Sequence, residues 1–238
     1  MEDKVVLIVG TGGIAVSCAR RFAAEGAQVV IAGRNFEKAK AIAGEIKNDQ
    51  GKAFAKEVDV TELPSVSKMV REVAEEQESI DVLINAFGQG IIKPVLDIRP
   101  DDARELIDVN VYGTFLMTQT VLRYMETARQ GRVVMFPGIL GKRVMKGSSV
   151  YSASKFAISG FTKALIEEQK RGRIKFTLMY LGGVSTDFWD QSNMNIKVKR
   201  NKMLSPESVA DAVLTAVSQP EDTAMNEIVL QPESHQMT

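Results

Sequence analysis

Short apolar runs rich in β-branched residues alternate with helix-patterned stretches along the whole chain, and this alternation constrains the fold more than any other feature. The runs that we expect to form buried strands are Lys4–Val9, Gln28–Ala32, Asp81–Asn85, Arg132–Phe136, Lys175–Tyr180 and Glu227–Leu230, with Phe54–Val58 as a further candidate. Helical spacing of apolar residues covers residues 39–46, 66–73, Asp101–Arg129, Tyr151–Arg171 and the stretch after Pro206. The pattern predicts an α/β fold, in which one doubly wound parallel sheet of about seven strands carries helices on both faces. No linker divides the chain, so we expect residues 1–238 to form a single domain.

The composition excludes several classes of function. The 30 Lys and Arg residues balance the 30 Asp and Glu residues, so no excess charge attracts nucleic acid or an anionic membrane. Cys18 and His235 are the only residues of their kinds, which excludes an intramolecular disulfide, a Cys-rich zinc site and a His-based catalytic triad. No apolar run approaches the roughly 18–20 residues that cross a bilayer. We therefore expect a cytoplasmic protein that binds no metal, nucleic acid or membrane.

A glycine-rich loop follows the first predicted strand and opens a helix. It fits the pattern G-x-G-x-x-G/A and reads Gly10-Thr11-Gly12-Gly13-Ile14-Ala15. In this pattern the first glycine allows a tight turn, the second lets the backbone approach a pyrophosphate, and the helix N-terminus supplies amide donors. A glycine turn that only connects strand to helix is the alternative. The position of the loop at the first strand–helix junction favours a dinucleotide site.

The end of the second predicted strand indicates which dinucleotide fits. A ribose 2′-hydroxyl is usually bound there by Asp or Glu, which would repel a 2′-phosphate. Here Gly33, Arg34 and Asn35 supply no acid but one guanidinium, which can form a charge-assisted contact with a 2′-phosphate. The alternative is that Arg34 is a solvated loop cation. The missing acid is a second, independent sign, so the sequence favours NADP(H) over NAD(H).

Tyr151 and Lys155 lie at positions i and i+4 of a predicted helix, so their side chains share one face. A free tyrosine has a pKa near ~10, which is too high for acid–base catalysis at neutral pH. The ammonium group of Lys155 and a nearby nicotinamide cation would both favour the phenolate and lower this pKa. On its own, the pair is also compatible with an ordinary exposed helix face.

In combination these motifs resemble the classical short-chain dehydrogenases/reductases, and the resemblance covers essentially the whole chain. The other residues that carry it are Asp59 and Val60 after the third strand, Asn85-Ala86-Phe87-Gly88 after the fourth, Asn110, and Gly182-Gly183-Val184-Ser185-Thr186 after the sixth. Several weak motifs in this order and spacing indicate the family more strongly than any one of them alone. The resemblance implies a Rossmann-type fold that binds a nicotinamide dinucleotide.

The resemblance also implies a role for each matching residue. Tyr151 would donate a proton to the substrate carbonyl oxygen as hydride leaves the nicotinamide, and Lys155 would hold the nicotinamide ribose and lower the tyrosine pKa. Asn110 would shape a water-linked proton relay to that lysine, which completes the catalytic set. The implied cofactor contacts, besides the glycine loop, residues 33–35 and the catalytic pair, are Asp59, Val60, Asn85, Ala86, Phe87, Gly182, Val184 and Thr186. For Asn85 and Thr186 the alternative is a loop residue that satisfies backbone groups.

Three departures from the family pattern bear on activity. The glycine loop is one residue shorter than usual, with Val9 and Ala15 where the family has threonine and glycine. Phe87 stands where a small residue is usual, and it would press on the cofactor or narrow the pocket. Gly138, thirteen residues before Tyr151, replaces the family's catalytic serine. Losing one such oxyanion donor typically costs about 10²–10³ in rate, so the dehydrogenase interpretation is weakened but retained. A backbone amide at Gly138 or Ile139, or an ordered water, is the candidate substitute.

Substrate contacts are expected from Gly138 and from the segment of about 186–205, which we interpret as a lid. Phe188 and Trp189 offer apolar surface for a hydrophobic or aromatic ligand, with a core-capping role as an equal alternative. The basic stretch Ile196–Lys202 favours a solvated lid, with an anionic substrate or carrier as the alternative. The two long predicted helices are similar to those that pair in the family, and they predict a homodimer or homotetramer.

We therefore expect an NADP(H)-dependent oxidoreductase of the carbonyl reductase type, which transfers hydride between the nicotinamide and a carbonyl or alcohol substrate. The alternatives are a catalytically weakened NADPH-binding sensor or scaffold, and a reductase of a conjugated C=C bond. The sensor hypothesis follows from Gly138, Phe87 and the shortened loop, whereas the retained Tyr151, Lys155 and Asn110 argue against it.

Overall fold

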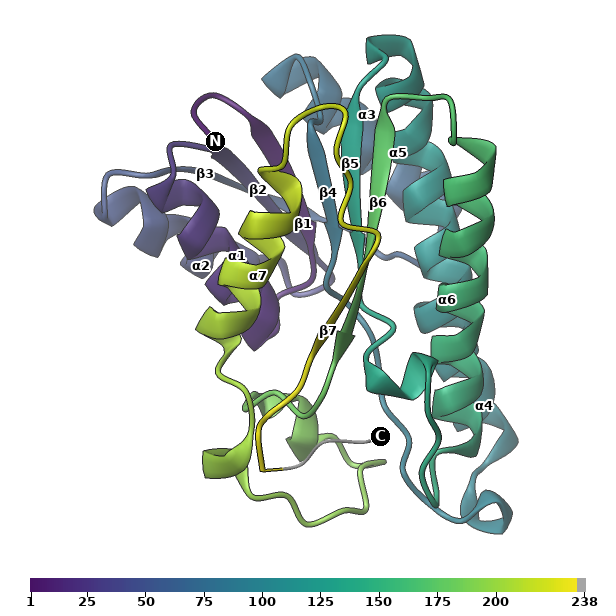
Figure 1. The fold of residues 1–238 in the computed structure, drawn as a ribbon. Helices are drawn as coiled ribbons and strands as arrows, with labels where there is room; N and C mark the ends of the chain where they lie inside the picture. Colours follow the sequence, from purple (N-terminus) through teal and green to yellow (C-terminus); the bar gives the residue numbers. More distant parts are fainter. Residues whose placement is uncertain (235–238) are drawn as a thin grey trace.

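Seven parallel strands form one sheet in the computed structural model, which describes residues 1–234 (Figure 1). The strands are β1 (Val5–Val9), β2 (Gln28–Gly33), β3 (Lys52–Glu57), β4 (Val82–Asn85), β5 (Gly131–Met135), β6 (Ile174–Leu181) and β7 (Glu227–Leu230). They lie in the order β3-β2-β1-β4-β5-β6-β7, and every neighbouring pair is parallel. The predicted fold class is confirmed. His235 lies outside the described residues.

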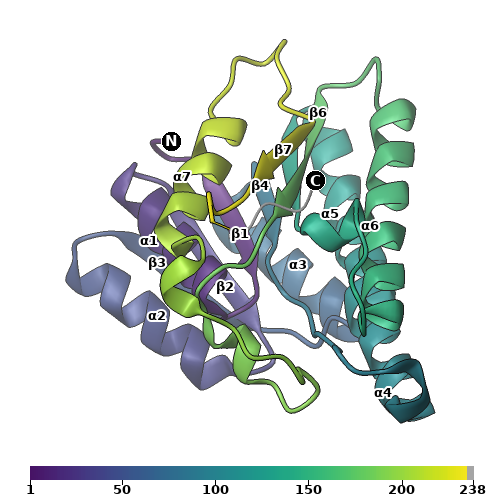
Figure 2. The ribbon, with the colours of Figure 1, turned by 60° about the horizontal axis from the view of Figure 1, so that its bottom comes forward.

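Helices cover both faces of this sheet (Figures 1 and 2). One face carries α1 (Gly13–Ala24), α2 (Phe36–Asn48) and α7 (Pro206–Val217), and the other carries α3 (Leu63–Gln77), α5 (Thr114–Ala128) and α6 (Ser149–Glu168). A shorter helix, α4 (Pro100–Ile107), packs against α6. No helix within the described residues combines the length and the apolar content needed to cross a membrane.

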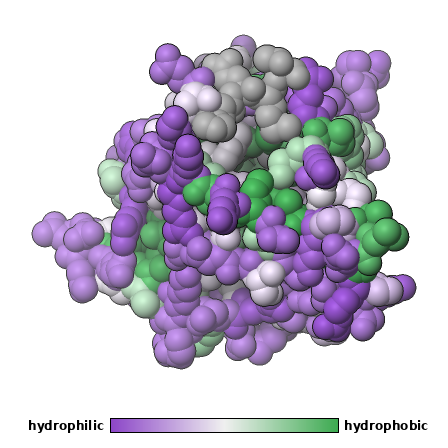
Figure 3. Space-filling model, turned by 90° about the horizontal axis from the view of Figure 1, so that it is seen from below, coloured by the Kyte–Doolittle hydropathy of each residue, from purple (hydrophilic) through white to green (hydrophobic). Residues whose placement is uncertain are grey.

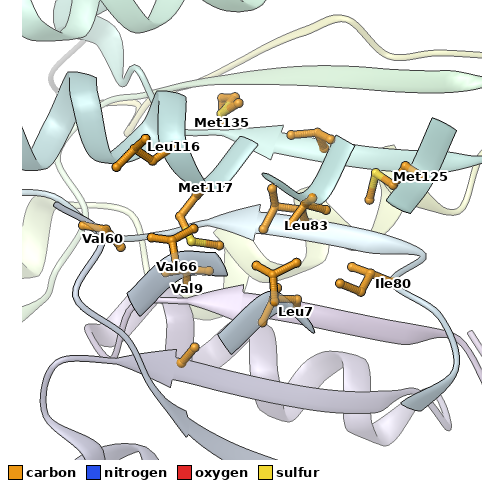
Figure 4. Close-up of a cluster of buried hydrophobic side chains, with 14 of the residues drawn as sticks. Leu7, Val9, Val60, Val66, Ile80, Leu83, Leu116, Met117, Met125 and Met135 are labelled. Carbon is orange, nitrogen blue, oxygen red and sulfur yellow. The ribbon is translucent and has the colours of Figure 1, made fainter. Parts of the chain in front are cut away.

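The strand periodicity of two divides the core between the faces. Leu7 and Val9 of β1 point into the cluster beneath α3 and α5, where Figure 4 shows them near Leu83 and Met117. Ile8 of the same strand points into the opposite cluster beneath α1, α2 and α7. All three β1 residues are at most 1% exposed, and burying such a side chain stabilises the fold by about 1.5–3 kcal/mol. The sheet edge that carries the loops is therefore held rigidly from both sides.

The helix predicted over about Asp101–Arg129 runs without interruption from Pro100 to Ala128, but its middle is π-helical, which the sequence did not predict. The structure has α4, then a π-helical segment η2 (Asp108–Gly113), then α5. Just after this π-helical segment, the Thr114 hydroxyl donates to the Asn110 carbonyl oxygen at 2.6 Å. Such π-helical turns widen the backbone locally and are frequent at functional sites. The other predicted elements form with shifted ends; the helix predicted over Tyr151–Arg171, for example, begins at Ser149 and ends at Glu168.

The topology opens a crevice at the carboxyl end of β1. This strand lies between β2 and β4. The connection after β1 leads to β2 and β3 on one side, and the chain then crosses back to form β4 on the other side of β1. Open α/β sheets bind ligands at such a point, where the strand order reverses. The Ala86 amide after β4 donates to the Val9 carbonyl at 2.8 Å, and the Gly10 amide after β1 donates to the Ala32 carbonyl at 2.7 Å. The loops after β1, β2 and β4 are thereby brought together.

Candidate active site

A cavity of about 830 Å³ lies at the carboxyl end of the sheet, on the face that Figure 3 shows from below. Most residues singled out in the sequence line it: Gly10, Thr11, Gly12, Gly13, Ile14, Gly33, Arg34, Asn35, Val60, Ala86, Phe87, Gly138, Tyr151, Lys155, Gly182, Val184, Thr186, Phe188 and Trp189. Asp59, Asn85 and Asn110 do not line it. Within the described residues no cluster of His, Cys, Asp and Glu could hold a metal ion.

The glycine loop forms a backbone cradle at the start of α1. Gly10 has φ of +126°, and a Cβ added there would lie 2.7 Å from the Ala86 carbonyl oxygen. A Cβ at Gly13 would lie 2.7 Å from Thr186 Cγ2, whereas at Gly12 it would meet nothing within 4 Å. Gly12 caps α1 without any side-chain hydrogen bond, so the first amides of the helix face this open space. The cradle suits a phosphate group.

Two cations stand at the end of β2. Arg34 and Lys38 both line the cavity, and Asn35 caps α2, its side-chain oxygen accepting from the Lys38 amide at 2.9 Å. Close by, the Asp59 carboxylate accepts from the Thr61 hydroxyl and amide at 2.7 and 2.9 Å. These hydrogen bonds, with a smaller contribution from the charge of Arg34, lower the pKa of Asp59. Asp59 is therefore committed to its own loop, while the cations face the cavity.

Tyr151 and Lys155 lie in the first turns of α6 and meet in the cavity. The Lys155 ammonium is 5.6 Å from the centre of the Tyr151 ring and donates to the Phe136 carbonyl at 2.9 Å. Lys155 is 7% exposed, and burial lowers its pKa to about 8. Burial raises the pKa of Tyr151, opposite to the direction predicted from the neighbouring ammonium. Desolvation by the surrounding side chains is the cause of this shift in the Tyr151 pKa.

Asn110 ties three segments together behind this pair. Its side-chain oxygen accepts from the Gln89 amide at 2.8 Å, and its side-chain nitrogen donates to the Gln89 carbonyl at 2.9 Å and to the Ser154 hydroxyl at 3.1 Å. A Cβ added at Gly88 would lie 3.1 Å from the Asn110 side-chain oxygen and 3.8 Å from the Lys155 nitrogen. Asn110 thus sits beside Lys155. Sequence reasoning missed Gln89 and Ser154, although Ser154 lies one helical turn after Tyr151.

Asn85 serves the sheet and not the cavity. It is 4% exposed and donates to the Thr118 hydroxyl at 3.1 Å and to the Met135 sulfur at 3.3 Å. These contacts join β4 to α5 and β5 through side chains, and neither of them is to a backbone group. Phe87, two residues later, lines the cavity and also packs against the core beneath α3 and α5.

Gly138 has a backbone conformation that residues other than glycine rarely adopt. Its φ is +64° and its ψ is 177°. Its amide donates to the Met179 carbonyl at 3.1 Å, and its carbonyl accepts from the Gly141 amide at 3.0 Å. The Gly138 amide is therefore already used within the fold and is not free to serve as the substitute donor. Ser148, close to Tyr151 in sequence, is fully buried and bonded to Met145 and Ser152.

The segment after β6 covers Tyr151. The Phe188 ring centre lies 6.0 Å from that of Tyr151, and the Trp189 indole nitrogen donates to the Val184 carbonyl at 2.7 Å. The Gly90 amide donates to the Gln191 side chain at 3.1 Å, and residues 92 and 193–195 exchange backbone hydrogen bonds of 2.9 and 3.1 Å. These contacts hold the segment against the loop after β4. Gln191 also lines the cavity and was not anticipated from the sequence.

Comparisons with known proteins agree with this geometry. The family model described as short chain dehydrogenase matches residues 4–197. An uncharacterized oxidoreductase of Staphylococcus aureus (strain USA300) is 33% identical over 233 residues, which is 98% of each chain. Among solved structures, an alcohol dehydrogenase from the archaeon Thermococcus sibiricus, complexed with 5-hydroxy-NADP, has a TM-score of 0.90 at 23% identity over 99% of each chain. A variant of actinorhodin polyketide ketoreductase with NADPH has a TM-score of 0.86 at 25% identity over 95% of each chain.

Proposed function

Because the chain belongs to the short-chain dehydrogenase/reductase family of oxidoreductases, we propose that it is an NADP(H)-dependent enzyme that interconverts a carbonyl and an alcohol, mainly as a reductase. The observation that carries the proposal is that one cavity joins the glycine cradle, Arg34, Tyr151 and Lys155. A proton donor and a dinucleotide site in contact with the same space are what hydride transfer to a carbonyl requires.

The residues of the cavity fit NADP(H). The open space over Gly12 and the amides of α1 suit the pyrophosphate, and Arg34 with Lys38 suits the 2′-phosphate. The complexes of the two structural neighbours with NADPH and 5-hydroxy-NADP support this choice of cofactor. When bound, the cofactor supplies the hydride. In this proposal Lys155, which is buried and donates to the Phe136 carbonyl, holds the nicotinamide ribose.

Tyr151 is the proposed proton donor to the carbonyl oxygen. At neutral pH the phenol is protonated, which is the form that donates, but burial raises its pKa and makes it a weaker acid, so the proposal relies on the neighbouring Lys155 ammonium to favour release of the proton. Asn110 positions Lys155 by fixing the loop of Gln89 on one side and α6 on the other. The lid excludes water through Phe188 and its contacts with the loop after β4. Gly138 supplies no hydroxyl, so the rate is expected to be about 10²–10³-fold lower than in a site that has this donor.

Gly138 favours a second candidate, a catalytically weakened NADPH-binding sensor or scaffold. Its glycine-only backbone and committed amide remove one oxyanion donor in a way that a side-chain rotation cannot restore. Reduction of a conjugated C=C bond, which depends less on that donor, is a further alternative that product analysis separates from carbonyl reduction.

The test is Tyr151→Phe, measured by NADPH fluorescence titration and by turnover of a panel of ketones. We expect NADPH affinity to stay within about two-fold of wild type and turnover to be lost, because only the transferred proton is removed. Tyr124→Phe, on the partly exposed side of α5, is the matched control and should keep both. Full activity of Tyr151→Phe would show the mechanism to be wrong, and NADPH binding by a wild-type protein inactive on every carbonyl would favour the sensor.

A further inference from the structure

The walls of the cavity carry far more positive charge than the chain as a whole. The chain is neutral, with 30 basic and 30 acidic residues. Among the described residues, the only acid that lines the cavity is Asp187, whereas the lining cations are Arg34, Lys38, Lys155, Lys197, Lys199 and Lys202. Such a concentration of one sign in a cleft raises the local concentration of anionic ligands.

The proposed cofactor accounts for only three of these cations. Arg34 and Lys38 lie where the 2′-phosphate would bind, and Lys155 lies beside Tyr151. The remaining three lysines all belong to the lid, between β6 and α7. They are therefore additional to what NADP(H) uses in the proposed site.

The lid does not neutralise its own lysines. Its acids Asp187 and Asp190 both pair with Arg200, at 3.7 and 2.5 Å. In the part of the chain that the structure describes, Lys197, Lys199 and Lys202 enter no salt bridge. All three are exposed, so their charges face the solvent at the cavity rim and remain available to a ligand.

The same segment places the lysines in one space with the proton donor. Phe188 packs beside Tyr151, and the Gly90–Gln191 hydrogen bond fixes the lid over the site. On the face in Figure 3, hydrophobic residues cross the centre and hydrophilic residues border them. This arrangement fits a ligand with an apolar body near Tyr151 and a charged end at the rim.

We propose that Lys197, Lys199 and Lys202 select carbonyl substrates that carry an anionic group, a carboxylate or a phosphate, remote from the carbonyl. This inference rests on the proposed function and names the substrate class of that site. Lysine offers a compact charge on a flexible stem, so the three residues recognise the sign of the group and do not demand one fixed geometry. Recognition of this kind weakens as salt is added.

The experiment compares three ketones of one shape: para-acetylbenzoate, its methyl ester and para-acetylphenylphosphonate. Each is tested with wild type, with Lys197→Gln/Lys199→Gln/Lys202→Gln, and with a charge-matched control, Lys47→Gln/Lys52→Gln/Lys170→Gln, whose exposed lysines do not line the cavity. At low ionic strength we expect kcat/KM for the two anions to exceed that for the ester by about ten-fold, mainly through KM. The lid variant should lose this preference, the control should keep it, and NADPH affinity should be unchanged in both. The relative rates for carboxylate and phosphonate distinguish the two anions.

Two results would overturn the inference: equal kcat/KM for anion and ester in wild type, or weaker NADPH binding by the lid variant, which would assign the lysines to the cofactor. If no ketone is turned over, the proposed function fails, but calorimetric titration of the NADP⁺-loaded protein still decides the inference. Tighter binding of the carboxylate than of the ester, lost in the lid variant, would support it, and equal binding would refute it.

Discussion

Replacing Gly138 by serine is expected to destabilise the protein without creating a working oxyanion donor. A Cβ at this position has room, because the nearest atom, the Leu181 carbonyl oxygen, is 3.6 Å away. The penalty comes from the backbone, since φ of +64° with ψ of 177° is a region that essentially only glycine occupies. Holding another residue there costs about 1–3 kcal/mol. For a domain of this size the melting temperature should fall by about 2–12 °C.

Two further variants separate the backbone effect from the hydroxyl. Gly138→Ala carries the same strain without an oxygen, so it should melt at nearly the same temperature as Gly138→Ser. Gly44→Ala is the matched control: Gly44 lies within α2, and a Cβ there meets nothing within 4 Å. That substitution should stabilise the protein by about 0.5–1 kcal/mol. Replacing glycine by alanine is thus expected to lower the stability of the protein at position 138 and to raise it at position 44.

The assays are thermal unfolding followed by circular dichroism and NADPH-linked reduction of the best ketone. Unchanged stability of Gly138→Ala would refute the strain argument, because it would mean that the loop after β5 relaxes freely. Turnover by Gly138→Ser well above that of Gly138→Ala would show that the new hydroxyl reaches the carbonyl. The backbone would then not be what excludes a serine.

Three other predictions follow from the site. Arg34→Ala should weaken NADPH binding by about ten- to hundred-fold in fluorescence titrations and leave NADH binding unchanged, because the charge-assisted contact with the 2′-phosphate is lost. An equal loss of affinity for NADPH and NADH would contradict the 2′-phosphate assignment. Asn110→Ala removes three hydrogen bonds of a residue that is 1% exposed. It should lower the free energy of unfolding in urea by about 1–3 kcal/mol and reduce kcat. An unchanged midpoint of urea unfolding would contradict this prediction. Burial lowers the pKa of Lys155 from 10.5 to about 8, so between about pH 8 and 10.5 the unfolded chain binds more protons than the folded one. The stability of the wild type should therefore rise with pH over this range, relative to that of Lys155→Met. Urea midpoints of the two proteins that follow parallel curves against pH would contradict this prediction.

The sheet was predictable from sequence because its strands are buried on both faces. Residues such as Leu7 and Ile8 enter opposite cores, so each strand reads as a continuous apolar run bounded by glycine or polar residues. The π-helical turn between α4 and α5 was not predictable in the same way. Apolar spacing continues through residues 108–113, and the π-helical turn coincides with the contacts of Asn110 to Gln89 and Ser154, which lie 21 and 44 residues away in sequence.

The site was predictable as far as it follows from topology. The carboxyl ends of parallel strands lie at the same end of the sheet, so the motif residues after β1, β2 and β4 meet in one cavity. Residue type alone did not show that Asp59 and Asn85 turn away from this space toward Thr61 and Thr118. Nor did it show the closed lid, which depends on contacts such as Gly90–Gln191 between residues 101 positions apart. Pairings of that kind leave no periodic signal.

The charge states of Tyr151 and Lys155 bear on the direction of the proposed reaction. Reduction needs a phenol that donates a proton, whereas oxidation needs a phenolate that accepts one. Burial raises the pKa of Tyr151, so at neutral pH the cavity holds the phenol. Burial also lowers the pKa of Lys155 to about 8, and above that pH the phenolate loses its nearest cation. The closed lid contributes to this burial through Phe188, which packs beside Tyr151. The packing of the lid against Tyr151 therefore adds to the burial that raises the pKa of this phenol.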